Sequence, residues 1–243
     1  MENSNLILKV DDLRVILGKD KIINDLSFKV HRGDSVAVIG PNGAGKTTLF
    51  KALMGMIPYA GKIQWQEGIR IGYVPQRMEI ETDIPLSVSE FLYLRQSKGF
   101  DRQKAKEAVK SVLLPEEILD KGLGEISVGQ RQRILIAWAL LGDPEVLLFD
   151  EPTADIDISG QESIYHLLHD LQRAFNLTMI LISHDLNIVY QYANEVLCLN
   201  RTKVCFGPPQ EMLGPEQMQK LYGGKRAIYQ HFHLEDNHHK HGG

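Results

Sequence analysis

The segment from residue 40 to residue 48 constrains the fold of this chain more than any other. It reads Gly-Pro-Asn-Gly-Ala-Gly-Lys-Thr-Thr and fits the pattern G-x-x-x-x-G-K-[ST] in full. A mostly apolar run, residues 34–39, precedes it, and a helical pattern from Leu49 to Met56 follows it. A glycine-rich loop between a buried strand and a helix N-terminus turns backbone N–H groups towards an anion. The pattern therefore predicts a phosphate-binding loop, formed by Gly40, Pro41, Asn42, Gly43, Ala44, Gly45, Lys46, Thr47 and Thr48.

The side chains around this loop indicate that the anion is a triphosphate held with a divalent cation. Lys46 is placed to reach the β- and γ-phosphates, and the Thr47 hydroxyl to bind Mg²⁺. Asp150 ends another buried run, residues 146–149, and is the expected acid for the same metal. Glu151 follows directly, and its expected role is to polarise the attacking water. A turn alone would explain two acids before a proline, but beside a phosphate-binding loop the catalytic interpretation is favoured.

Apolar runs and helical patterns alternate along the chain, which predicts an α/β fold with a parallel, doubly wound sheet. Buried runs at residues 145–149 and 178–182 are followed by helical patterns at 161–175 and 186–192. The region from about residue 82 to residue 141 has helical patterns in place of strands, and it is interpreted as a helical lobe inserted into the core. The helices predicted in the lobe span residues 87–96, 102–114 and 129–141, and β-leaning runs near the N-terminus span residues 6–10, 13–17 and 26–30.

Charge and hydropathy exclude several classes of protein. The chain has 27 Lys+Arg against 31 Asp+Glu, a net charge of −4, so it lacks the basic excess that nucleic-acid binding needs. Its longest apolar run, Ile134 to Leu141, is far shorter than the roughly 20 residues of a membrane span. The N-terminus does not read as a secretory signal. Cys198 and Cys205 are too few for a disulfide framework and are expected in the core or on an edge strand rather than as metal ligands.

Three further segments identify the class of phosphate-loop protein. They are Tyr-Val-Pro-Gln at residues 73–76, Ile-Ser-Val-Gly-Gln at 126–130, and Glu-Pro-Thr-Ala-Asp-Ile-Asp at 151–157. In this order and spacing the chain resembles the ATP-binding subunits of ABC transporters, from about Leu6 to Leu221. The resemblance implies a P-loop NTPase core with a parallel sheet, an N-terminal antiparallel β subdomain and the inserted helical lobe at about 82–141. It places one ABC ATPase domain at residues 1–230 and leaves residues 231–243 as a His-rich tail.

The resemblance also implies roles for single residues, with ATP and Mg²⁺ as the ligands. Gln76 corresponds to a glutamine that senses Mg²⁺ and links the core to the helical lobe, and His184 to a switch histidine at the γ-phosphate; both join Glu151 as catalytic candidates. Ser127, Gly129 and Gln130 lie in the signature segment, which would contact the γ-phosphate bound by a second copy of the chain. Asp157 corresponds to the D-loop aspartate of the family and is a further candidate for nucleotide binding.

The signature segment also has a purely local interpretation. Ser127 and Gln130 fit a capping box that opens the helix running to Leu141. The two interpretations are compatible, because an exposed helix N-terminus is also an anion site.

Two residues depart from the family pattern. Val128 stands where the signature usually has a glycine, which predicts reduced backbone freedom at that position. Leu17 aligns with the aromatic residue that usually stacks on adenine. Because leucine covers a base only by dispersion, we expect weaker adenine affinity.

The segment from Ile71 to Phe91 is similar to the metal-uptake branch of the family, the zinc and manganese importers. Neutral imidazoles are good ligands for Zn²⁺, so the tail is a candidate zinc sensor or buffer. It lacks the fixed spacing of a structural zinc site, and a solvated tail without a role remains the alternative. The tail histidines are His231, His233, His238, His239 and His241.

The resemblance further implies partners and a location. The chain is expected to act as a head-to-tail homodimer on integral membrane permease subunits, peripheral at the cytoplasmic face of the membrane. An extracytoplasmic metal-binding protein would contribute indirectly. An importer of iron chelates or another small nutrient, and a nucleotide-dependent regulator with weak catalysis, remain the alternatives.

Overall fold

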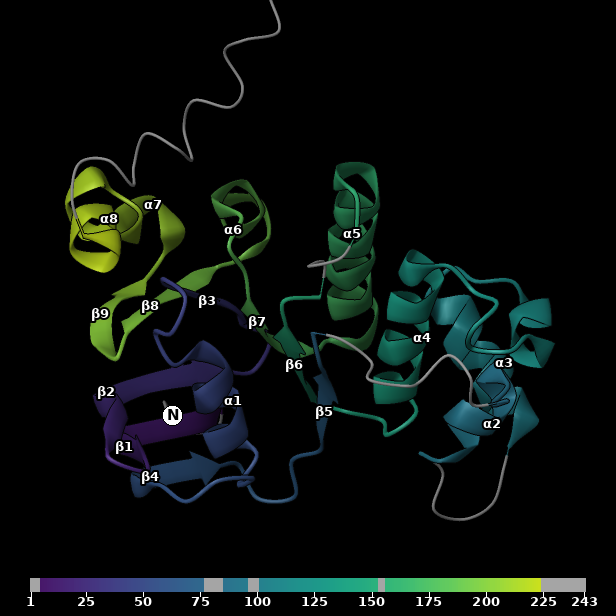
Figure 1. Ribbon diagram of the computed structural model, residues 1–243, viewed down its shortest axis with the longest axis horizontal. Coiled ribbons are helices and arrows are strands. Elements are labelled where there is room, and N and C mark those ends of the chain that lie inside the picture. Colours follow the sequence, from purple (N-terminus) through teal and green to yellow (C-terminus); the bar gives the residue numbers. More distant parts are fainter. Residues whose placement is uncertain (1–4, 77–84, 96–100, 153–155, 224–243) are drawn as a thin grey trace, which may run out of the picture.

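The computed structural model of the protein describes residues 5–76, 85–95, 101–152 and 156–223 (Figure 1). A six-stranded sheet in the order β5-β6-β7-β3-β8-β9 forms its centre. The predicted parallel sheet is found in five of these strands, whereas β9 pairs antiparallel with β8 at the edge. The strands are β3 (Ser35–Ile39), β5 (Ile71–Val74), β6 (Val146–Asp150), β7 (Thr178–Ile182), β8 (Glu195–Asn200) and β9 (Thr202–Gly207).

Side chains of the central strands alternate between two hydrophobic cores, one on each face of the sheet. On β6, Leu147 and Phe149 enter one core, and Val146 and Leu148 enter the other. Strands buried on both faces read as continuous apolar runs, which is why β3, β6 and β7 are visible in the sequence.

Figure 1 shows which elements cover the two faces. Helix α1 (Lys46–Leu53) lies on one side together with a second, three-stranded sheet, and α5 (Ile158–Phe175), α6 (Leu186–Tyr192) and α8 (Pro215–Tyr222) lie on the other. A short helix, α7 (Pro209–Met212), joins β9 to α8.

The second sheet is antiparallel, as the family resemblance implied, and has the order β2-β1-β4. Its strands are β1 (Leu6–Leu17), β2 (Asp20–His31) and β4 (Ala60–Trp65). The two runs expected at residues 6–10 and 13–17 are one strand, because the pairing continues through an irregularity between Val10 and Leu13. Asp12 adopts a left-handed conformation there, with φ of 47°, which is typical of a β-bulge. The bulge interrupts the sequence pattern without ending the strand.

The segment from residue 85 to residue 141 contains helices and, among its described residues, no strand beyond an isolated bridge between Ser87 and Gly122. We call these helices the helical lobe: α2 (Val88–Tyr93), α3 (Arg102–Ser111), the 3₁₀ helix η1 (Glu116–Asp120) and α4 (Val128–Leu140). Figure 1 shows the lobe beside the end of the central sheet that carries β5 and β6. Helix α4 packs on both α3 and β5, so it joins the lobe to the core.

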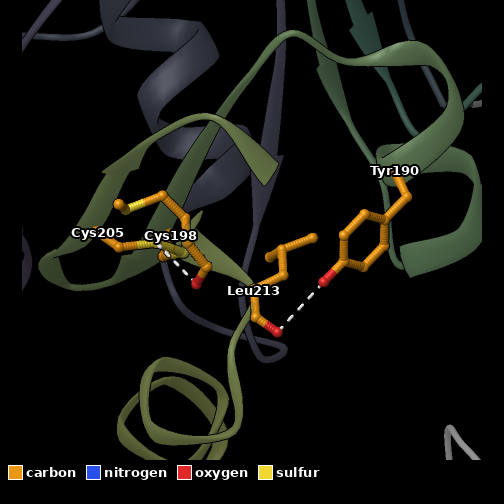
Figure 2. Close-up of a disulfide and its surroundings, with 5 residues drawn as sticks. Tyr190, Cys198, Cys205 and Leu213 are labelled. Atoms are coloured by element: carbon orange, nitrogen blue, oxygen red, sulfur yellow. Dashed lines mark hydrogen bonds between the residues drawn. A yellow bond between two sulfur atoms is a disulfide. The ribbon is translucent and has the colours of Figure 1, made fainter. Parts of the chain in front are cut away.

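Cys198 on β8 and Cys205 on β9 occupy opposite positions in the register of these strands and are joined by a disulfide (Figure 2). Both are buried, which agrees with their predicted place in the core or on an edge strand. The β8–β9 hairpin brings the two cysteines together, and the sequence alone did not indicate this disulfide. Nearby, the Tyr190 hydroxyl donates to the Leu213 carbonyl at 3.5 Å and connects α6 to the segment after α7 (Figure 2).

Among the described residues, none of the helices combines the length and apolar character needed to cross a bilayer.

Candidate active site

The loop between β3 and α1 has the backbone of a phosphate cradle. Gly40, Gly43 and Gly45 all have positive φ, at 154°, 76° and 100°. A Cβ on Gly40 would lie 2.0 Å from the Leu199 carbonyl oxygen, so only glycine fits beside β8. Gly45 is the N-cap of α1, and no described side chain caps the first N–H groups of this helix. The loop therefore presents backbone donors at a helix N-terminus, the arrangement that binds phosphate.

Lys46 lies at the base of this cradle and is only 6% exposed. Its Nζ donates to the Gly40 carbonyl at 2.9 Å and to the Pro41 carbonyl at 3.2 Å, so the ammonium is held over the loop. Burial lowers the pKa of Lys46, and the nearby charges of Glu151 and Asp150 oppose that shift. The residue is thus a partly desolvated cation with two acids close by, which suits it to a polyanionic ligand.

Asp150 ends β6 beside Thr47, the second residue of α1. The Thr47 hydroxyl donates to Asp150 Oδ1 at 3.3 Å, and the Tyr73 hydroxyl donates to Oδ2 at the same distance. The carboxylate is 3% exposed, and burial raises its pKa; the charge of Glu151 adds to the shift, while the two hydroxyl donors and Lys46 oppose it.

These side chains fit a magnesium ion by their chemistry. Mg²⁺ prefers oxygen ligands and is usually bound in proteins through one or two carboxylates together with substrate phosphates. Thr47 and Asp150 bring a hydroxyl and a carboxylate together beside the phosphate cradle. A divalent cation would also relieve the unfavourable burial of the Asp150 charge.

Glu151, directly after β6, joins two residues that are distant in the sequence. Gln76 Nε2 donates to Glu151 Oε2 at 2.9 Å, and His184 Nε2 lies 2.6 Å from Glu151 Oε1. Glu151 has φ of 49°, a conformation uncommon for residues other than glycine and often found at functional sites. The structure thus brings the three catalytic candidates of the sequence analysis into one hydrogen-bonded group.

The ends of parallel strands explain this convergence. Gln76 follows β5, Glu151 follows β6 and His184 follows β7, and these three strands are neighbours in the sheet. Their carboxyl ends share one edge with the end of β3, where the phosphate loop begins. Ligands of open parallel sheets bind at this edge.

The signature residues lie around a different pocket. Ser127 is the N-cap of α4, and the predicted capping box is present: Gln130 N donates to Ser127 Oγ at 3.2 Å, and Ser127 N donates to Gln130 Oε1 at 3.0 Å. A pocket next to this helix start is lined by Ser127, Gly129 and Asp157, among others. It shares no lining residue with the pocket that contains Glu151 and His184.

The departure at Val128 has a smaller backbone effect than the sequence predicted. Val128 is the first residue of α4 and takes an ordinary helical conformation, which valine adopts without strain. Its side chain is 47% exposed at the helix start, so the substitution changes the surface rather than the backbone. A Cβ on Gly129 would meet nothing within 4 Å, which leaves open space beside the helix N-terminus.

Two polar side chains near the site were not assigned roles from the sequence. Tyr73 lies inside a quoted motif, but its contact with Asp150 depends on the pairing of β5 with β6. Arg133 on α4 donates to the Val112 carbonyl at 2.7 Å and to Ser163 Oγ at 2.8 Å, and so links the lobe to α5. The sequence gives no signal for either contact, because both partners are distant along the chain.

Other expected sites receive no further support from the geometry. The tail histidines lie outside the described residues, as do residues 153–155 of the quoted segment 151–157. Within the part of the chain that is described, no three His, Cys, Asp or Glu side chains are grouped so that they could hold a metal ion. Leu17 is 43% exposed at the end of β1.

Comparisons with known proteins agree with this geometry. Residues 23–154 match the family model described as ABC transporter. The chain is 37% identical to the zinc import ATP-binding protein ZnuC of Pseudomonas putida, over 98% of this chain and 93% of that protein. An ABC transporter solved in an inward-facing conformation matches with a TM-score of 0.80 and 30% identity, over 89% of this chain and 88% of that one. CbiO1 of Clostridium perfringens, part of the ABC transporter complex cbiONQ, matches with a TM-score of 0.77 and 26% identity, over 94% and 96% of the two chains.

Proposed function

The chain belongs to the ABC transporter family as an ATPase subunit of an importer, and we propose that it powers the uptake of a metal ion. Zinc is the first candidate for this ion, and manganese is the second. The proposal that the chain hydrolyses ATP rests on the hydrogen-bonded group of Glu151, Gln76 and His184 beside the phosphate loop. The relatives named as zinc import proteins, such as that of Pseudomonas putida at 37% identity, support the choice of zinc.

In the proposed mechanism, Glu151 accepts a hydrogen bond from the water that attacks the γ-phosphate of ATP. His184, held at 2.6 Å from the same carboxylate, orients Glu151 and contacts the phosphate. Lys46 stabilises the charge that develops on the phosphate oxygens. Thr47 and Asp150 would hold Mg²⁺, which would supply further positive charge at the phosphates. Gln76 connects this group to the segment that leads into the helical lobe.

The Glu151→Gln variant tests the catalytic role. We expect ATP turnover to fall by about 10²–10⁴-fold, the usual contribution of a general base, while ATP binding is retained. Glu67→Gln is the matched control, because Glu67 is exposed in the turn before β5. Unchanged turnover in Glu151→Gln would reject the assignment. If the intact protein hydrolyses no ATP even with its membrane partners, a nucleotide-dependent regulator becomes the better explanation.

We propose that two copies pair head to tail, each placing its signature residues on the nucleotide of the other. The separation of the Ser127 pocket from the Glu151 pocket supports this arrangement. The open space beside Gly129, at the N-terminus of α4, leaves room for a phosphate to approach. Analytical ultracentrifugation of Glu151→Gln with ATP and Mg²⁺ is expected to show a dimer that dissociates when ATP is removed. A monomer under both conditions would contradict the pairing.

Growth of cells that lack this chain tests the cargo. With a zinc chelator in the medium, we expect the wild-type chain to restore growth, Glu151→Gln to fail, and added zinc to make both unnecessary. Rescue by manganese but not zinc would assign the other metal. Rescue by a ferric chelate alone would favour the alternative importer of iron chelates.

We further propose that the five tail histidines form a low-affinity zinc sensor or buffer. Calorimetric titration with zinc would compare the intact chain with a full-length variant in which these five histidines are alanine. Equal zinc binding by both proteins would reject the proposal.

A further inference from the structure

Tyr73 is aimed at the proposed metal site by the pairing of two strands. In the parallel register of β5 and β6, Tyr73 lies opposite Leu148. Side chains alternate along a strand, so Leu148 and Asp150 point to the same face of the sheet. Tyr73 packs against the core on that face, which is also the face covered by α1. The phenol is thereby directed along the sheet surface towards Asp150.

The two oxygens of the Asp150 carboxylate receive hydrogen bonds from different elements. Thr47 of α1 donates to Oδ1 at 3.3 Å, and Tyr73 of β5 donates to Oδ2 at 3.3 Å. With Oδ2 engaged by the phenol, Oδ1 is left turned towards the threonine hydroxyl, the other proposed Mg²⁺ ligand. A carboxylate held at both oxygens cannot rotate freely about its terminal torsion.

The hydrogen bond between the two side chains has a defined direction. An ionised carboxylate only accepts hydrogen bonds, so the Tyr73 O–H is the donor and Asp150 Oδ2 is the acceptor.

We propose that Tyr73 is a positioning residue for magnesium: its hydroxyl fixes the Asp150 carboxylate so that Oδ1 and the Thr47 hydroxyl face the metal together. This inference rests on the proposed assignment of Thr47 and Asp150 as Mg²⁺ ligands. The same contact ties the end of β5 to the metal site three residues before Gln76. Metal ligands are commonly oriented by such hydrogen bonds, and their loss typically lowers metal affinity 10–100-fold.

The test measures ATP affinity by calorimetry on the full-length protein, first in EDTA and then across a series of Mg²⁺ concentrations. Tyr73→Phe keeps the ring and removes only the hydroxyl. We expect its half-saturating Mg²⁺ concentration to rise by about 10-fold. Its ATP affinity in EDTA is expected to equal that of the wild type. Tyr59→Phe is the matched control, because Tyr59 is 41% exposed and takes no part in the proposed site.

A second measurement separates positioning from packing. In the Asp150→Asn background the carboxylate is gone, so adding Tyr73→Phe is expected to leave the half-saturating Mg²⁺ concentration unchanged. Binding of Mn²⁺ in place of Mg²⁺, followed by electron paramagnetic resonance with ATP present, should show the same order of affinities.

The outcomes distinguish this inference from the proposed function. If the wild-type protein binds ATP equally well with and without Mg²⁺, the metal assignment itself fails. If the wild type responds to Mg²⁺ and Tyr73→Phe responds at the same concentration, the metal site stands and the positioning role is wrong. Equal losses of ATP affinity in EDTA and in Mg²⁺ would also overturn it, because a packing defect acts without the metal.

Discussion

Replacing Arg133 with methionine should weaken both the packing inside the helical lobe and the attachment of the lobe to α5. Arg133 on α4 donates to the Val112 carbonyl at 2.7 Å and to Ser163 Oγ on α5 at 2.8 Å. Burial lowers the pKa of its guanidinium, but arginine stays charged in proteins. Hydrogen bonds from charged groups contribute about 1.5–3 kcal/mol each when buried, and less when exposed. The variant Arg133→Met retains the apolar stem but leaves the Val112 carbonyl without this donor.

We expect Arg133→Met to lower the free energy of unfolding by about 2–3 kcal/mol, most of it from the bond to the Val112 carbonyl. Urea denaturation of the full-length protein without nucleotide measures this quantity. Arg102→Met is the matched control in the same lobe: Arg102 pairs with Asp120 at 2.8 Å, but the two side chains are 54% and 67% exposed. An exposed pair of this kind contributes at most about 1 kcal/mol.

A double-mutant cycle isolates the contact between the lobe and the core. The bond from Arg133 to Ser163 is more exposed, so the coupling between Arg133→Met and Ser163→Ala is expected to be about 0.5–1 kcal/mol. Two results would refute the reasoning. The first is that Arg133→Met lowers the free energy of unfolding no more than Arg102→Met does. The second is that the losses of unfolding free energy in Arg133→Met and Ser163→Ala simply add in the double mutant.

Three further predictions concern residues of the proposed nucleotide contacts. Because burial raises the pKa of Asp150, its contribution to stability is fully present below the ordinary value of 3.8 and is lost as the pH rises through the raised one. Asp150→Asn should therefore have a higher melting temperature than the wild type at pH 7, and this difference should shrink towards pH 4. A difference in melting temperature that does not vary with pH would contradict this. Ser127→Ala removes the N-cap of α4 and should cost about 1 kcal/mol in urea denaturation, whereas Ser127→Asn should restore most of it; equal stability of all three proteins would show that the cap is unimportant. Leu17→Tyr should tighten ATP binding in calorimetry, since stacking on a base contributes about 1–3 kcal/mol, and an unchanged dissociation constant would reject the assignment of Leu17 to the adenine position.

Three strands of the central sheet that the sequence revealed are buried on both faces, whereas the N-terminal runs became the half-buried strands β1 and β2. Runs near residues 35–39, 145–149 and 178–182 are apolar except at their first residue, and they became β3, β6 and β7. Strand β4, with mostly exposed side chains, and β5, with only four residues, have no comparable run and were not identified. A short strand, or one with mostly exposed side chains, is stabilised by pairing with its neighbours. The local sequence pattern does not indicate that pairing.

Helix ends were predictable where a capping residue marks them. Ser127 and Gln130 indicated the start of α4, and the structure contains both reciprocal bonds of the capping box. The end of α1 was placed at Met56, but the helix ends at Leu53, because Met54 and Gly55 leave the helix in a turn. Capping interactions join residues that are close in the sequence, so the sequence predicts a capped helix end more directly than other features of a helix.

The sequence by itself determined the phosphate loop and the two acids at the end of β6. These features depend on neighbouring residues: positive φ at Gly43 and Gly45, and a carboxylate at the end of an apolar strand. Only the tertiary structure decided that Gln76, Glu151 and His184 meet, that the Ser127 pocket lies apart from them, and that Tyr73 reaches Asp150. The physical reason is the strand order β5-β6-β7-β3-β8-β9, which sets neighbours by packing and hydrogen bonding between distant segments. The motifs thus identify the chemical groups, and the order of the strands determines which of them act together.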